Sequence, residues 1–281
     1  MRSYCIKTDN EKIIEYLLNK ISNLDFPDIY YCNKSFKIYE NVILHYKESN
    51  IEKFHNIVAN LITDTTLEFY QDKIIKRIIN VNYFYFDALE RNIIFDDCYE
   101  FLEQDEEEIR ETIFTQVKSY IAENKNIVLE GLINFRINDY LKILDNIVDM
   151  AVNKYIIEKE YKEFINLLKI YVNSTEPKTD ILHLIYVNGE SILLDNDKNI
   201  IQMDYNINNA KYLSDITFSS NDMALNTLLS LLPKRIEAHI INKEDEFINT
   251  LKLIFENKIR ICTECNICKT YKMINNIKIS K

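Results

Sequence analysis

Residues that interrupt helices and strands are nearly absent from this chain. Its 281 residues include two glycines and three prolines. Glycine favours turns because it tolerates left-handed backbone angles, and proline breaks helices because it has no amide hydrogen to donate. We therefore expect long, uninterrupted elements, and motifs that need several glycines are excluded.

The first part of the chain, residues 1–49, is expected to form a small αβ segment. Residues 3–7 alternate loosely in polarity and are typical of a strand. Asp9 is expected to cap a helix over 11–21, where apolar residues recur three and four positions apart. The β-branched and aromatic residues over 36–46 favour a strand or a hairpin.

The next region, residues 50–175, is expected to be helical. Between Pro27 and Pro177 the only glycine or proline is Gly131, and apolar residues three and four apart dominate. An acidic run over 103–108 favours a helix start, because carboxylates stabilise the positive end of the helix dipole, or else it is a solvated face. The spacing predicts helices over 50–70, 71–94, 96–122 and 126–172, the last broken near Gly131.

Beyond a linker over 173–180, strands and helices alternate. Asn188 and Gly189, between two apolar runs, favour a tight hairpin, and 199–203 is a candidate third strand. A strand, a helix of about a dozen residues and a second strand are typical of a parallel pair with a crossover connection. The fold class is therefore α+β, with a mostly helical centre and a C-terminal α/β unit with a mixed sheet over 178–281. The later elements are expected over 222–233, 235–241, 244–256 and 258–262.

Three of the six cysteines lie in one short run at the end of the last predicted strand: Cys262, Cys265 and Cys268. Thiolates at this spacing can converge on one metal ion or form labile disulfides. His239 lies towards the carboxyl end of its own predicted strand. If these two strands are parallel neighbours, their carboxyl ends share one edge of the sheet and His239 approaches the cysteines.

Several chemistries fit these four residues. Three thiolates and one imidazole make a closed tetrahedral zinc site. An iron–sulfur cluster is the next candidate, although the fourth cysteine of the bacterial ferredoxin spacing is missing. A Cys-x-x-Cys pair could also carry thiol redox chemistry. The alternative without a metal, in which the thiols are inert or redox-labile and His239 packs within its strand, stays open.

The remaining titratable residues show no convergent catalytic pattern. Glu158 and Lys162 are four residues apart, the spacing of a surface ion pair, so structural pairing is favoured over acid–base chemistry for Glu158, Glu160, Glu163 and Arg136. No glycine-rich phosphate loop, GxSxG or HExxH motif is present, which excludes large classes of nucleotide enzymes. The scattered histidines and cysteines are interpreted as structural: His45, His55, His183, Cys5, Cys32 and Cys98.

The charge balance argues against a protein built mainly to hold nucleic acid. The formal net charge is −10, whereas nucleic-acid binding needs a basic face. The lysines after the cysteine run, Lys269, Lys272, Lys278 and Lys281, are interpreted as part of a solvated, frayed terminus. No apolar run approaches the ~20 residues that span a bilayer, and no signal peptide is recognised, so a cytoplasmic location is expected.

Three stretches together resemble the YtxC-like family of sporulation proteins from endospore-forming bacteria. They cover about half of the chain, from Glu130 onward: EGLINFRINDY (130–140), VNKYIIEKEYKEFINLLKIYV (152–172), and LLPKRIEAHI with LIFENKIRICTECNIC (231–268). The resemblance implies a cytosolic role linked to sporulation, and it implies no reaction, cofactor or catalytic residue.

Two functions are therefore expected from the sequence. The first is a non-enzymatic cytosolic protein that binds another protein and has a C-terminal metal site. The alternative is a thiol- or metal-dependent enzyme or redox protein that uses the run from Cys262 to Cys268.

Overall fold

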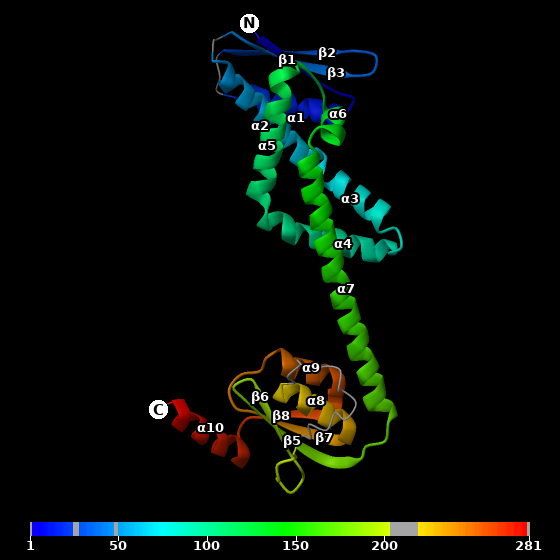
Figure 1. The fold of residues 1–281 in the computed structure, drawn as a ribbon, viewed down its shortest axis with the longest axis vertical. Coiled ribbons are helices and arrows are strands. Elements are labelled where there is room, and N and C mark those ends of the chain that lie inside the picture. The colour runs from blue at the N-terminus through cyan, green and yellow to red at the C-terminus, as the bar shows by residue number, and fades with distance from the viewer. Residues whose placement is uncertain (1, 25–27, 48–49, 203–218, 280–281) are drawn as a thin grey trace, which may run out of the picture. The chain divides into compact units, whose positions relative to one another are not determined.

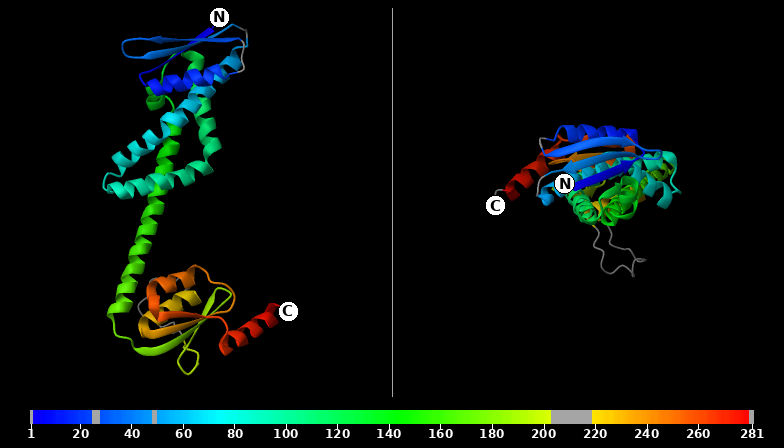
Figure 2. Two further views of the ribbon diagram at one scale, coloured as in Figure 1. Left: turned by 180° about the vertical axis from the view of Figure 1, so that it is seen from behind. Right: turned by 90° about the horizontal axis from the view of Figure 1, so that it is seen from above.

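The structure is a computed structural model that describes residues 2–24, 28–47, 50–202 and 219–279. The chain divides into two compact units, residues 1–157 and 158–281, which are described one at a time (Figures 1 and 2). Across these described residues, no helix combines the length and apolar character needed to cross a membrane.

A four-stranded sheet in the order β2-β3-β1-β4 begins the first unit (Figure 1). β2 and β3 form an antiparallel hairpin, β1 pairs with β3, and β4 lies parallel to β1. The range 36–46, predicted to hold a strand or a hairpin, contains one strand, because the first strand of the hairpin lies wholly before residue 36. The strands are β1 (Arg2–Thr8), β2 (Ile29–Ser35), β3 (Glu40–Tyr46) and β4 (Asn126–Val128).

Helix α1 (Glu11–Ser22) follows β1, as the sequence predicts, but its cap differs from the prediction. Asn10 is the N-cap residue, and its side-chain oxygen accepts a hydrogen bond of 3.0 Å from the amide of Lys12. The assignment of Asp9 as the cap was therefore wrong by one residue. Either side chain can cap a helix, so the apolar spacing alone did not fix the boundary.

Two of the predicted helices of the first unit, 71–94 and 96–122, are each interrupted, the second at Asp105. The predicted helix 71–94 is interrupted before Asp87, whose side chain accepts from the amides of Leu89 and Glu90 in a capping box. The acidic run does mark a helix start, since α5 has Glu106, Glu107 and Glu108 in its first turn. The helices are α2 (Ile51–Phe69), α3 (Gln71–Asn82), α4 (Ala88–Gln104) and α5 (Glu106–Glu123).

The helix predicted over 126–172 is broken, as expected, but the break lies beyond Gly131. Gly131 lies inside α6 (Leu129–Phe135), and the interruption comes at Arg136, before α7 (Asn138–Ser174) begins. Apolar side chains from the sheet and helices of this unit form one buried cluster, in which Tyr46 stacks on Phe54.

The second unit is built on a sheet in the order β6-β5-β7-β8 (Figure 1). β5 and β6 form the predicted antiparallel hairpin, in which Asn188 and Gly189 take positive φ angles of 53° and 82°. β7 lies between β5 and β8 and is parallel to both, so the expected parallel pair is present. The strands are β5 (Thr179–Val187), β6 (Glu190–Leu194), β7 (Pro233–Ile240) and β8 (Ile259–Cys262).

The candidate third strand over 199–203 is not a strand in its described part. A single bridge joins Ile200 to Leu194, and residue 203 lies outside the described residues. The helical elements of this unit are the end of α7, α8 (Ser220–Leu231), α9 (Glu246–Phe255), the 3-10 turn η1 (Glu256–Lys258) and α10 (Asn266–Ile279).

The two faces of this sheet carry different clusters. Leu184 and Ala238 face a core that includes Leu228 of α8 and Leu251 of α9. Ile185 belongs instead to a smaller cluster with Leu194, Ile241 and Cys268. In this cluster, Cys268 comes from α10. Because side chains alternate along a strand, residues next to core positions in β5 and β7 lie on the opposite face of the sheet, the face of the smaller cluster. The α+β fold class, with a helical centre and a mixed C-terminal sheet, is confirmed.

Candidate metal centre

Strands β7 and β8 bring the predicted histidine and the first cysteine to one place. His239 and Cys262 are directly opposite each other in the parallel register of the two strands. Opposite residues on neighbouring strands have their side chains on the same face. His239 is buried, with 3% of its surface exposed, and Cys262 is partly buried.

The turn after β8 and the start of α10 supply the other two cysteines. Cys265 immediately precedes α10, and its carbonyl oxygen accepts a hydrogen bond of 3.0 Å from the amide of Lys269. Cys268 lies three residues later, so both cysteines are on one side of the first turn. The Cys268 side chain is fully buried.

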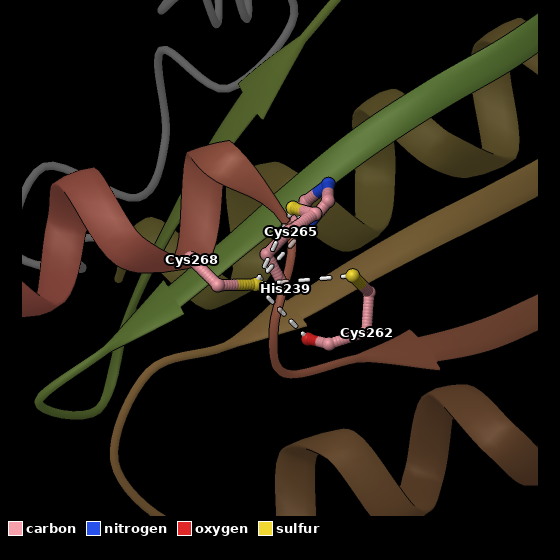
Figure 3. A group of neighbouring side chains, drawn as sticks. All are labelled: His239, Cys262, Cys265 and Cys268. Atoms are coloured by element: carbon pink, nitrogen blue, oxygen red, sulfur yellow. Dashed lines mark hydrogen bonds between the residues drawn. The ribbon is translucent and has the colours of Figure 1, made fainter.

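The four side chains converge on one point (Figure 3). Nδ1 of His239 lies 3.3 Å from Sγ of Cys265 and 3.4 Å from Sγ of Cys268. Sγ of Cys268 is 3.6 Å from Sγ of Cys265 and 3.9 Å from Sγ of Cys262. All four atoms lie within 4.8 Å of one another, and among the described residues this is the only group of its kind. We refer to it as the Cys3His cluster.

The four separations from 3.3 to 3.9 Å are close to the edges of a metal-centred tetrahedron. Two sulfurs bonded to zinc at about 2.3 Å lie about 3.8 Å apart, and a sulfur and an imidazole nitrogen lie about 3.6 Å apart. A disulfide would instead need sulfurs about 2.05 Å apart, and all six cysteines are free thiols. The Cys3His cluster therefore has the spacing of ligands around a single ion.

The second ring nitrogen of His239 also has a partner, which sequence analysis missed. Nε2 of His239 lies 3.0 Å from Nδ1 of His183 in β5. His183 was interpreted as structural, and nothing in the sequence predicted this contact with His239. The alternation of His183 with the apolar Leu182 and Leu184 indicates that His183 lies on the opposite face of the sheet from these leucines. The residue that it meets there depends on the register of β5 against β7, which cannot be read from the sequence.

The environment favours neutral imidazoles at this site. Burial lowers the pKa of His239, the neighbouring His183 lowers it further, and Glu237 opposes the shift. Burial likewise lowers the pKa of His183, against the opposing charges of Glu237 and Asp195. A neutral imidazole keeps the lone pair that a metal ion requires.

The thiols of Cys265 and Cys268 differ in acidity. Burial raises the pKa of Cys265, but hydrogen bonds from the backbone amides of Cys268 and Ile267 and from the thiols of Cys262 and Cys268 outweigh it, so the net shift is downward. Burial and the neighbouring thiols raise the pKa of Cys268 to about 12. A coordinated cation reverses such a rise, because a ligating thiol is deprotonated.

The donor set fits zinc better than the alternatives. Three sulfurs and one nitrogen complete a tetrahedral shell, which is typical of structural zinc sites and leaves no position for a substrate. An iron–sulfur cluster distributes its thiolates over several iron atoms, so its ligands are spread more widely than the sulfurs here. The Cys3His cluster could therefore hold one metal ion such as zinc.

Other predicted residues lie outside this cluster. Glu158 and Lys162 form the expected surface pair, with 3.7 Å between Oε2 and Nζ. Cys98 is buried, as expected, whereas Cys5 and Cys32 are only partly buried. The lysine-containing end is helical as far as Ile279, so it is not simply a frayed terminus within the described residues.

Fold and site together define an α+β protein whose C-terminal unit carries a Cys3His cluster. The chain belongs to the YtxC-like family, whose model matches residues 56–260. It is also similar to the uncharacterized protein YtxC of Bacillus subtilis (strain 168), with 19% identity over 204 residues that cover 69% of this chain and 72% of the relative. No solved structure matches.

The family match extends beyond the stretches that first suggested it. It begins well before Glu130 and takes in most of the helical part of the first unit. It includes His183 and His239, and it ends two residues before Cys262. Family membership therefore does not assign the Cys3His cluster, whose interpretation depends on its own geometry.

Proposed function

We propose that the C-terminal unit binds one structural zinc ion through Cys262, Cys265, Cys268 and His239. The observation that carries this proposal is the convergence of four ligand atoms within 4.8 Å, with separations close to tetrahedral edges. Because the shell is complete with protein ligands, zinc here would hold structure and would not activate a substrate.

The role of this ion is to fasten α10 to the sheet. Among the α10 side chains described, over 266–274, only Cys268 is buried. Ile267 and Tyr271 pack against the small cluster but are only partly buried, so apolar burial holds this helix less firmly than a helix with a fully buried face. A short helix is also marginal alone in water. A metal ion bonded to β7, β8 and α10 supplies the missing attachment, since structural zinc contributes directly to folding.

In the cell, the protein would act in the cytoplasm during sporulation, as a non-enzymatic protein that binds another protein. The resemblance supports the link to sporulation, and the acidic net charge of −10 argues against nucleic acid as the partner. The closed ligand set also favours a binding protein over an enzyme.

Zinc content and one pair of variants test the metal proposal. Protein purified without a metal-affinity tag should contain about one equivalent of zinc by elemental analysis. Cys265→Ser should lose most of this zinc and melt at a lower temperature, because the ion no longer holds α10. Cys32→Ser, which removes a partly buried thiol of the first unit, should keep the zinc. Metal-free wild-type protein with three freely reactive thiols would reject the proposal.

Thiol redox chemistry is the second candidate, because the pKa of Cys265 is lowered and its sulfur lies 3.6 Å from that of Cys268. A lowered pKa increases the thiolate fraction, which is the form that attacks disulfides. If this candidate is correct, zinc-free protein should form a Cys265–Cys268 disulfide reversibly in a glutathione redox buffer. Full zinc occupancy that blocks this oxidation would favour the structural role.

A further inference from the structure

We propose that His183 is the positioning residue of the Cys3His cluster: it accepts a hydrogen bond from Nε2–H of His239 and so fixes Nδ1 of His239 as the ligand atom. This inference deepens the proposed function and rests on it.

The hydrogen-bond pattern around His239 leaves one consistent arrangement of protons. A neutral imidazole carries hydrogen on one nitrogen only. Nδ1 of His239 faces the sulfurs of Cys265 and Cys268 at 3.3 Å and 3.4 Å, so this nitrogen must present its lone pair to an ion. The hydrogen then resides on Nε2, which lies 3.0 Å from Nδ1 of His183. His183 must therefore accept at Nδ1 and carry its own hydrogen on Nε2.

The sheet holds the two rings in place. β5 and β7 are parallel neighbours, and Ile185, two residues after His183, is directly opposite His239. Leu182 and Leu184, on either side of His183 in the chain, are buried in the core on the other face. The two ring planes lie within 25° of parallel, with centroids 5.2 Å apart, which permits an in-plane hydrogen bond. Because both histidines lie in strands, the orientation of their rings is held more precisely than it would be in a loop.

An imidazole also suits the charge of this site. Ligating histidines usually donate their second N–H to a carboxylate, a carbonyl or water. Three thiolates around a divalent cation already leave one net negative charge, and a carboxylate in contact with His239 would add another. A neutral His183 orients the His239 ring without adding charge. In this respect it resembles the backbone carbonyl that accepts from the ligating histidine in other metal sites.

The test uses the full chain and zinc itself as the probe. His183→Leu removes the acceptor at similar size, His183→Gln retains an acceptor oxygen, and His45→Leu is the control. His45 is likewise a partly buried histidine in a strand, and it forms a hydrogen bond with Ser3 in the first unit. Zinc affinity is measured by chelator competition. The tautomers of His239 and His183 are read from ¹⁵N chemical shifts of the ring nitrogens.

We expect His183→Leu to bind zinc about 10- to 100-fold more weakly, the usual cost of losing such a partner. His183→Gln should recover much of this loss, and His45→Leu should bind like the wild type. In wild-type protein, His239 should carry hydrogen on Nε2 and bind the metal through Nδ1, and His183 should carry hydrogen on Nε2.

Three results would overturn the proposal. If His183→Leu binds zinc with wild-type affinity and its His239 tautomer is unchanged, the role of His183 is rejected. The proposed metal site would not be affected by this result. If His183→Leu does not fold, a wild-type spectrum with hydrogen on Nδ1 of His183 would reject it independently. Wild-type protein that binds no zinc would reject the proposed function, and this inference with it.

Discussion

At the scale of single residues, chemistry at the Cys3His cluster depends on partners that the sequence only partly reveals. The run from Cys262 to Cys268 and its approach to His239 could be predicted, because strand order and thiol spacing are visible in the sequence. His183 could not be recognised as a partner, because its distance of 3.0 Å to His239 depends on the register of β5 against β7. Register is set by packing across the whole sheet.

The unequal acidity of the thiols gives a prediction at this scale. In metal-free protein between pH 7 and 8, iodoacetamide should modify Cys265 faster than Cys268. The pKa of Cys265 lies below its usual value and that of Cys268 is raised to about 12, so Cys265 has the larger reactive thiolate fraction. Raising the pH towards 9 should speed modification of Cys265 first. Mass spectrometry of tryptic peptides measures both rates, and faster labelling of Cys268 would contradict the assignment.

At the scale of helices and strands, periodicity predicted element types better than element ends. The strands and helices of the C-terminal unit were largely predictable because strong apolar patterns separate them. The predicted helix over 71–94 was wrong in length, because Asp87 and Glu90 form a capping box within a stretch that contains no glycine or proline. A side-chain cap therefore starts α4 at a place where no glycine or proline marks the boundary.

The attachment of α10 gives a prediction at the scale of elements. Removing zinc with a chelator should increase amide hydrogen exchange across α10, because within its described part Cys268 is the one buried side chain. Exchange in α9 should change little, because its Ile248, Leu251 and Ile254 are buried in the core on the other face of the sheet. Peptide-level mass spectrometry resolves the two helices. Equal protection of α10 with and without zinc would show that the ion does not fasten it.

At the scale of the whole molecule, the chain consists of two compact units, and the second carries the candidate metal centre. The division 1–49, 50–175 and 178–281 drawn from the sequence remains a prediction about folding units. A single helix, α7, crosses the boundary without a glycine or proline, so no interrupting residue marks where the first compact unit ends.

Zinc-edge X-ray absorption spectroscopy on the zinc-loaded full chain tests the central claim most directly. The account predicts one zinc ion with three sulfur neighbours at about 2.3 Å and one imidazole nitrogen at about 2.0–2.1 Å. His239→Ala should lose the nitrogen contribution of the imidazole and keep the sulfurs. A first shell dominated by oxygen, or one without the three sulfurs, would contradict the Cys3His site.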